Sequence, residues 1–127
     1  MLGLGSRTRV FVYAQPADMR KSFFTLSELV RREMKQDPLS GDAFVFVNLR
    51  RTMSKCLIYD GTGLCLTSKR LAQGRFAAPW QRETEIVFTM SASELALFFE
   101  GSQLVFMGSL SPARVGPSSV VSSPLVV

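Results

Sequence analysis

The sequence predicts an α+β fold in which a mostly antiparallel sheet is covered by two helices. Three observations predict it: β-branched and aromatic runs separated by turn residues, one long amphipathic segment, and one short capped helix near the C-terminal end. The 127 residues suffice for one domain with a modest core, which we expect to span residues 1–108. Residues 109–127 are rich in Ser, Pro and Val and have no period, so we expect a flexible, disordered tail there.

The first half of the chain predicts a strand followed by a helix. The run "TRVFVYAQ" (8–15) has the composition of a strand. Asp18 is expected to cap a helix that runs to about Lys35, and the turn cluster "QDPLSG" (36–41) ends it. The core-facing stripe of this helix would consist of Met19, Phe23, Leu26, Val30 and Met34, with Leu29 at its edge.

The second half predicts four more strands and a second helix. The expected strands are "AFVFVNL" (43–49), "SKCLIY" with "GLCLTS" (54–59 and 63–68), "ETEIVFTM" (83–90) and a last strand "SQLVFMGS" (102–109). Ser91 would cap the second helix, and Gly101 would close it. The order of elements is therefore β-α-β-β-β-β-α-β.

The two cysteines flank a predicted hairpin turn that begins at Asp60. A two-residue loop, Asp60-Gly61, would place Cys56 opposite Cys65, whereas a loop from Asp60 to Gly63 would place Cys56 opposite Thr67. Two small, buried, reduced residues are the expected outcome, with a disulfide as the alternative.

Charge is distributed unevenly along the chain. The net charge is +5, but residues 1–82 carry 14 basic and 6 acidic residues (14 − 6 = +8), and residues 83–127 carry 1 and 4 (1 − 4 = −3). The sequence therefore predicts a positive face that favours acidic partners.

The residue types needed for most catalytic sites are missing. The chain has no His, which excludes Ser-His-Asp and Cys-His arrangements, and "GLGSRT" lacks the Lys of a phosphate-binding loop. The acids occupy turns, caps and helices rather than a converging cluster. We therefore expect no enzyme, metal, cofactor or small-molecule substrate. No targeting or membrane-spanning segment is apparent, so we expect a cytoplasmic protein without a membrane partner.

Binding is the function that remains. Cations flank the predicted hairpin and also line the first helix opposite its apolar stripe. The helix cations are Arg20, Lys21, Arg31, Arg32 and Lys35. Phe24 lies in the middle of this basic arc, where either a neighbouring loop covers it or it is exposed for stacking or partner binding. A basic helix face can also be simply solvated. If both groups of cations share one face, that face suits phosphate recognition.

Five segments together resemble a known family. They are "PADMRKSFFTL" (16–26), "DPLSGDAFVFVNLRR" (37–51), "YDGTGLCL" (59–66), "KRLAQGRFAAPW" (69–80) and "SELALFFEG" (93–101). In this order they resemble the small TnpB accessory proteins, encoded by the second open reading frame of the bacterial insertion-sequence-sixty-six elements. The resemblance implies a role in transposition beside a separate, catalytic transposase.

Two hypotheses of different classes follow. In the first, the protein binds DNA at or near the element ends, with little sequence specificity. The DNA-binding residues would be Arg20, Lys21, Arg50, Arg51, Lys55, Lys69, Arg70 and Arg75. In the second, it is an adaptor that docks on the transposase without contacting DNA, and the partner-binding residues would be Phe24, Arg31 and Arg32.

Overall fold

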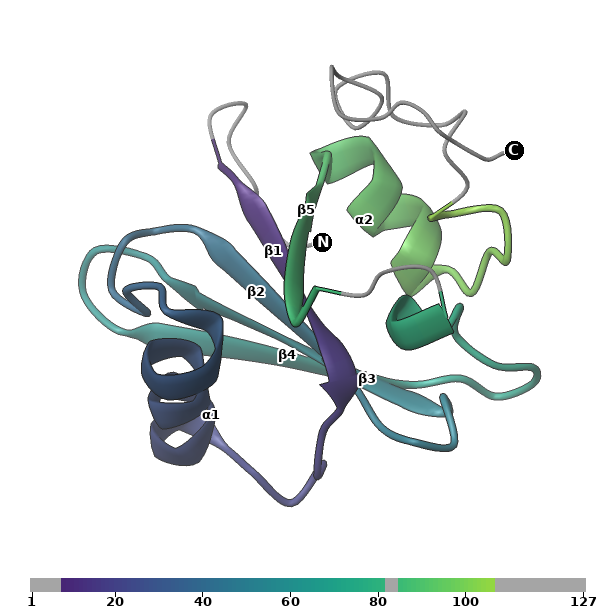
Figure 1. Ribbon diagram of the computed structural model, residues 1–127, viewed down its shortest axis with the longest axis horizontal. Coiled ribbons are helices and arrows are strands. Elements are labelled where there is room, and N and C mark those ends of the chain that lie inside the picture. The colour runs from purple at the N-terminus through teal and green to yellow at the C-terminus, as the bar shows by residue number, and fades with distance from the viewer. Residues whose placement is uncertain (1–7, 82–84, 107–127) are drawn as a thin grey trace.

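The computed structural model describes residues 8–81 and 85–106, in which a five-stranded sheet lies between two helices (Figure 1). The strands are β1 (Val10–Pro16), β2 (Ala43–Val47), β3 (Met53–Tyr59), β4 (Leu64–Arg70) and β5 (Val87–Met90). Their order across the sheet is β4-β3-β2-β1-β5. The pair β1–β2 is parallel and the other three pairings are antiparallel. This arrangement confirms the predicted α+β fold with a mostly antiparallel sheet.

The two faces of the sheet bury separate cores. On one face, Leu26 and Val30 pack against the strands, and on the other face Leu95 and Phe98 do so. Every residue of β2 is buried because the strand is covered on both sides. Figure 1 shows the helices α1 (Phe23–Leu29) and α2 (Ala92–Phe99) on opposite sides of the sheet. Neither helix within the described residues has the length and apolar character of a membrane span.

The first helix begins later than the sequence predicted, which corrects the role of Asp18. The N-cap of α1 is Ser22, whose N–H donates to the hydroxyl of Thr25 at 2.9 Å. The Asp18 carboxylate instead accepts hydrogen bonds from the backbone and guanidinium of Arg20. Because this ion pair organises the β1–α1 loop, Met19 lies outside the helix. The helix ends close to the predicted position, through a π-helical turn, Val30–Met34.

The C-terminal part confirms one predicted helix boundary and corrects one strand. Ser91 caps α2: its hydroxyl accepts from the Glu94 N–H, and its own N–H donates to the Glu94 carboxylate. The strand expected at 83–90 is limited to β5, with residues 82–84 outside the described residues. The strand expected at 102–109 is wrong for residues 102–106, which form turns that bury Val105 and Phe106 against the core. Residues 107–109 and the expected tail, 109–127, lie outside the described residues.

The β3–β4 hairpin has the longer of the two predicted loops. Asp60 N–H donates to the Gly63 carbonyl at 3.0 Å, and Cys56 pairs with Thr67. Both cysteines are free. Cys56 is buried as expected, and burial raises the pKa of its thiol to about 12. Cys65 is exposed, which corrects the expectation that both are buried, because β4 is an edge strand.

Acid should weaken this hairpin through Asp60. Its carboxylate accepts hydrogen bonds from the N–H groups of Thr62 and Gly63 and from the Thr62 hydroxyl, which lowers the Asp60 pKa to about 2. A carboxyl group whose pKa is lower in the folded state stabilises the fold above its unfolded pKa of about 3.9, and that contribution disappears as pH falls toward 2. We therefore expect the melting temperature of Asp60→Asn to fall less than that of the wild type between about pH 5 and pH 2. An equal fall in melting temperature for both proteins over this pH range would contradict this role of Asp60.

Candidate nucleic-acid interface

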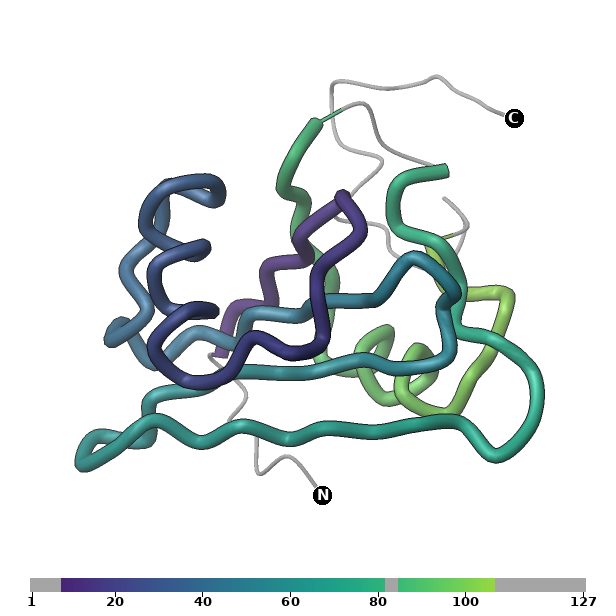
Figure 2. The backbone as a smooth tube through the Cα atoms, turned by 90° about the horizontal axis from the view of Figure 1, so that it is seen from below, coloured from purple at the N-terminus to yellow at the C-terminus, as the bar shows by residue number. Residues whose placement is uncertain are grey.

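Two basic segments that are distant in sequence meet at one end of the sheet. They are the β2–β3 turn (48–52) and the segment that follows β4 (71–76), which lie side by side in Figure 2. Backbone hydrogen bonds hold them together, since the Leu71 N–H donates to the Thr52 carbonyl at 3.0 Å and the Phe76 N–H to the Arg51 carbonyl at 2.7 Å. This juxtaposition gathers four arginines, here called the arginine end: Arg50, Arg51, Arg70 and Arg75.

The positive charge of the arginine end is not neutralised locally. Arg50, Arg70 and Arg75 are exposed, and the half-buried Arg51 has its guanidinium 3.5 Å from the Phe76 carbonyl oxygen. Residues 43–59 and 61–81 contain no Asp or Glu. None of the four forms an ion pair with a carboxylate of residues 8–81 or 85–106. A surface of this kind attracts polyanions.

Asn48 makes the β2–β3 turn rigid. Its side-chain oxygen accepts from the N–H groups of Thr52 and Met53, at 2.9 and 3.1 Å, and its amide donates to the Thr52 hydroxyl. Arg51 adopts a left-handed conformation with φ of 62°, which the Asn48 hydrogen bonds hold in place. The turn therefore presents Arg50 from a fixed backbone, and less entropy is lost when a ligand binds.

Two predicted DNA-binding lysines have structural positions instead. Lys55 is buried, and its ammonium donates to the carbonyls of Met19 and Lys21 at 2.8 and 2.7 Å. The Lys69 ammonium donates to the Phe99 carbonyl at the end of α2, where a cation complements the helix dipole. Lys69 and Arg70 are adjacent in β4 but have different surroundings, because successive side chains of a strand point to opposite faces of the sheet. Lys69 faces α2, and Arg70 faces the opposite side. These findings correct the expectation that both lysines belong to an open basic surface.

The cations of the first helix and its preceding loop are largely matched by acids. The Asp18 carboxylate forms an ion pair with the Arg20 guanidinium, with an oxygen–nitrogen distance of 2.7 Å, and this contact lowers the Asp18 pKa to about 2. Glu28 lies 3.2 Å from Arg31 and 3.9 Å from Arg32. The expected single surface formed by helix and hairpin cations is therefore divided, and the excess charge lies at the arginine end.

Comparison with known proteins identifies the family. A family model described as "IS66 Orf2 like protein" matches residues 8–107. The chain belongs to the IS66 Orf2-like family. Two Sinorhizobium fredii proteins, the uncharacterized proteins y4jC and y4hO, are each 34% identical over 101 residues. The alignments cover 80% of this chain and 85% and 86% of those proteins. No solved structure matches.

Family membership confirms the predicted resemblance and indicates an accessory role in transposition. The matched residues of this IS66 Orf2-like protein include the arginine end and both helices. The match does not distinguish DNA binding from docking on another protein, whereas the unequal neutralisation of the cations bears directly on that choice.

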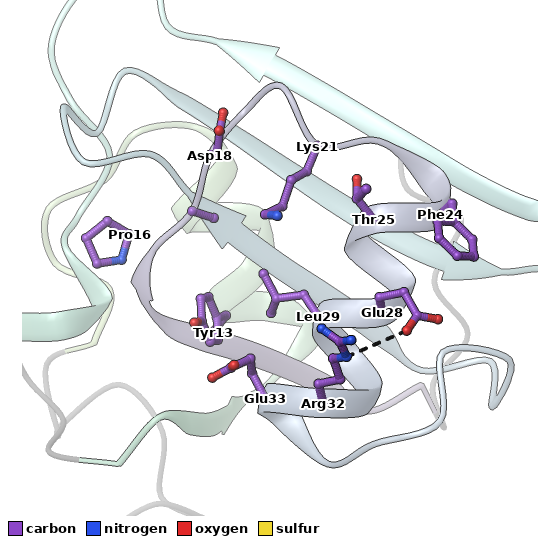
Figure 3. A pocket seen from close by; sticks show the side chains of 11 residues that line it. Tyr13, Pro16, Asp18, Lys21, Phe24, Thr25, Glu28, Leu29, Arg32 and Glu33 are labelled. Carbon is purple, nitrogen blue, oxygen red and sulfur yellow. Dashed lines mark ion pairs between the residues drawn. The ribbon is translucent and has the colours of Figure 1, made fainter.

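The structure also shows a groove that the sequence did not predict. It has a volume of about 710 Å³ and lies between the end of β1, the β1–α1 loop and α1 (Figure 3). Lys21 points into it and Phe24 stands at its rim with 73% of its surface exposed. The alternative in which a loop covers Phe24 is therefore wrong. Tyr13 lines the groove from β1, and nothing in the sequence pattern except its position in a predicted strand indicated this role.

Removing the Lys55 ammonium should loosen the loop that carries one wall of this groove. In Lys55→Met the apolar stem is retained, but the carbonyls of Met19 and Lys21 lose their donor. We expect a loss of about 1–3 kcal/mol in the free energy of unfolding, the usual cost of leaving a buried hydrogen-bonding group without its partner. Urea unfolding measures this change in free energy. Lys35 is exposed, so Lys35→Met provides the matched control. An equal, small effect in both variants would show that the two hydrogen bonds contribute little.

Proposed function

We propose that this IS66 Orf2-like protein acts in transposition as a non-catalytic accessory protein that binds duplex DNA through the arginine end. The observation that carries the proposal is the gathering of four arginines that form no ion pair with any carboxylate of residues 8–81 and 85–106, on segments joined by backbone hydrogen bonds. Guanidinium groups match the geometry of phosphate oxygens, to which they form two parallel hydrogen bonds.

The binding should be led by the phosphate backbone rather than by base edges. The four arginines lie in a turn, at the end of strand β4 and in the loop after it, and no helix carries them into the major groove. Contacts of this kind position a protein on DNA and carry little sequence information. An accessory protein that follows DNA near the element ends with low specificity fits this arrangement, with the transposase supplying the chemistry.

Salt dependence tests the proposal directly. Four phosphate contacts predict that the logarithm of the association constant falls with the logarithm of salt concentration with a slope of about −3.6, and affinity should drop about 100-fold between 50 and 200 mM. Fluorescence anisotropy of a short labelled duplex, titrated with the purified full chain, measures both values. Absence of binding at low salt, or an affinity that salt leaves unchanged, would overturn the proposal.

A second candidate function is docking on the transposase through Phe24, Arg31 and Arg32. The exposure of Phe24 favours it, because an aromatic ring left in solvent beside a groove is typical of interface residues. Co-purification of the transposase of the same element, with and without Phe24→Ser, tests this role. Retention of the transposase by the wild type alone would support it, and equal retention or none would count against it.

A further inference from the structure

Strand β4 forms one edge of the sheet, and its outer side is open. Among residues 8–81 and 85–106 the strand order places β3 beside it and no strand on the other side. In Figure 2, β4 runs along the border of the molecule, and neither helix lies beyond it. All seven residues of β4 pair with β3 in one continuous register. The open edge is therefore long and regular.

The pairing with β3 shows which backbone groups of β4 have no partner. The Asp60 N–H donates to the Gly63 carbonyl at the turn, and the Leu71 N–H donates to the Thr52 carbonyl at the other end of the ladder. Hydrogen-bonded and non-hydrogen-bonded pairs alternate between these two points, so the odd-numbered residues of β4 bond to β3. The N–H and C=O groups that point away from the sheet belong to the even-numbered residues: Leu64, Leu66, Ser68 and Arg70. No backbone hydrogen bond from another segment of the described residues reaches these four.

The strand lacks the features that usually close an open edge. Natural edge strands are often very short, interrupted by a proline or a bulge, or blocked by a lysine. The opposite edge follows this rule, because β5 has only four residues. In contrast, β4 has no proline and no bulge, and the ammonium of Lys69 is engaged by the Phe99 carbonyl. The edge of β4 can therefore accept another strand.

The strand that fits this edge is β4 of a second copy. A contact between β4 and β5 of another copy would leave further edges open and would repeat without closing, whereas a β4–β4 contact closes as a two-fold dimer. An antiparallel pair centred on Thr67 uses the whole strand. Leu64 then lies opposite Arg70 of the second copy, and the outward groups of both strands meet. Leu66 lies opposite Ser68 in the same way.

Charge selects the antiparallel orientation. The two cations of β4, Lys69 and Arg70, lie at one end of the strand. A parallel pair would place Arg70 beside Arg70 of the second copy, and like charges side by side are destabilising. The antiparallel pair separates them by six residues, about 20 Å, which exceeds the screening length of ~8 Å at physiological salt. At its centre Thr67 faces the same residue of the second copy, a pair that stabilises sheets.

We propose that two copies of this chain form a two-fold dimer by antiparallel pairing of β4 with β4, which joins the two five-stranded sheets into one continuous sheet. The two-fold axis is perpendicular to the sheet, so both Arg70 side chains lie on the same face. Dimerisation goes beyond the proposed function and does not rest on DNA binding. Where the arginine end binds DNA, the dimer carries two such ends.

A proline at Ser68 tests the dimer without disturbing the monomer. Ser68 is exposed and its N–H points outward, so Ser68→Pro keeps the bonds to β3 and removes one donor per copy from the dimer. Two lost hydrogen bonds should weaken dimerisation about 100-fold, roughly tenfold each. Sedimentation velocity of the full chain measures this, with Ser68→Ala as the matched control that should dimerise as the wild type does. Circular dichroism shows that Ser68→Pro is folded.

Disulfide trapping tests the register of the pair. Cys56 lies opposite Thr67 in β3, so the starting chain carries Cys56→Ala and Cys65→Ser. Adding Thr67→Cys places two thiols directly across the two-fold axis, where mild oxidation should link the copies. Adding Ser68→Cys instead places them diagonally, too far apart to link. A monomeric wild type, a dimer that Ser68→Pro leaves intact, or equal cross-linking of the two cysteine variants would overturn the proposal.

Discussion

The double variant Arg70→Glu/Arg75→Glu is expected to bind duplex DNA about 100-fold more weakly than the wild type at low salt, roughly tenfold for each reversed charge. Both side chains are exposed: Arg70 is the last residue of β4, and Arg75 lies in the segment after it, which backbone hydrogen bonds attach to the β2–β3 turn. Each reversal removes a phosphate contact and also places a carboxylate near the contacts that remain. The slope of the salt dependence should become shallower by about 2, one unit for each contact that is lost.

A variant with the same change in net charge separates a local surface from bulk charge. Arg31→Glu/Arg32→Glu carries an identical reversal on the first helical segment, where Glu28 already pairs with both arginines. It should retain DNA binding to within a few fold. Equal losses in the two double variants would show that net charge, and not the arginine end, attracts DNA. Circular dichroism spectra and melting temperatures of both variants establish that they are folded.

Phe98→Ala is expected to cause the largest loss of stability, about 3–5 kcal/mol, as is usual when a buried aromatic residue is truncated. Phe98 is fully buried on the inner side of α2. Its ring stacks on Phe76 with centroids 5.0 Å apart and contacts Phe106 at 5.5 Å. The substitution therefore opens a cavity where α2, the segment after β4 and the chain after α2 meet. Such a loss is a large fraction of the roughly 5–15 kcal/mol that typically stabilises a domain.

Leu97, the preceding residue of α2, provides the control. It is 40% exposed, so Leu97→Ala removes apolar atoms from the same helix without opening a buried cavity. Urea unfolding should show a midpoint well below that of the wild type for Phe98→Ala and one close to it for Leu97→Ala. Similar midpoints for both variants would show that the aromatic cluster adapts to the missing ring.

Local sequence signals predicted most elements because their causes are local. Ser91 caps α2 as predicted, since a hydroxyl and a carboxylate three residues apart satisfy the first N–H groups of a helix wherever it lies. Asp18 carries an equally good capping signal, yet the prediction that it caps the first helix was wrong. Its carboxylate binds Arg20 instead, a competition between two local partners that residue types alone do not settle.

The basic character of the chain and its family were also determined by the sequence, because net charge, composition and ordered motifs need no coordinates. The tertiary structure alone decided which cations remain available. Lys55 and Lys69 looked equivalent to Arg70, yet pairing and alternation in the sheet turn both lysines toward backbone carbonyls, where they bind the fold together. Accessibility depends on contacts between segments distant in sequence, so only the folded sheet divides cations that stabilise the protein from those free to bind a partner.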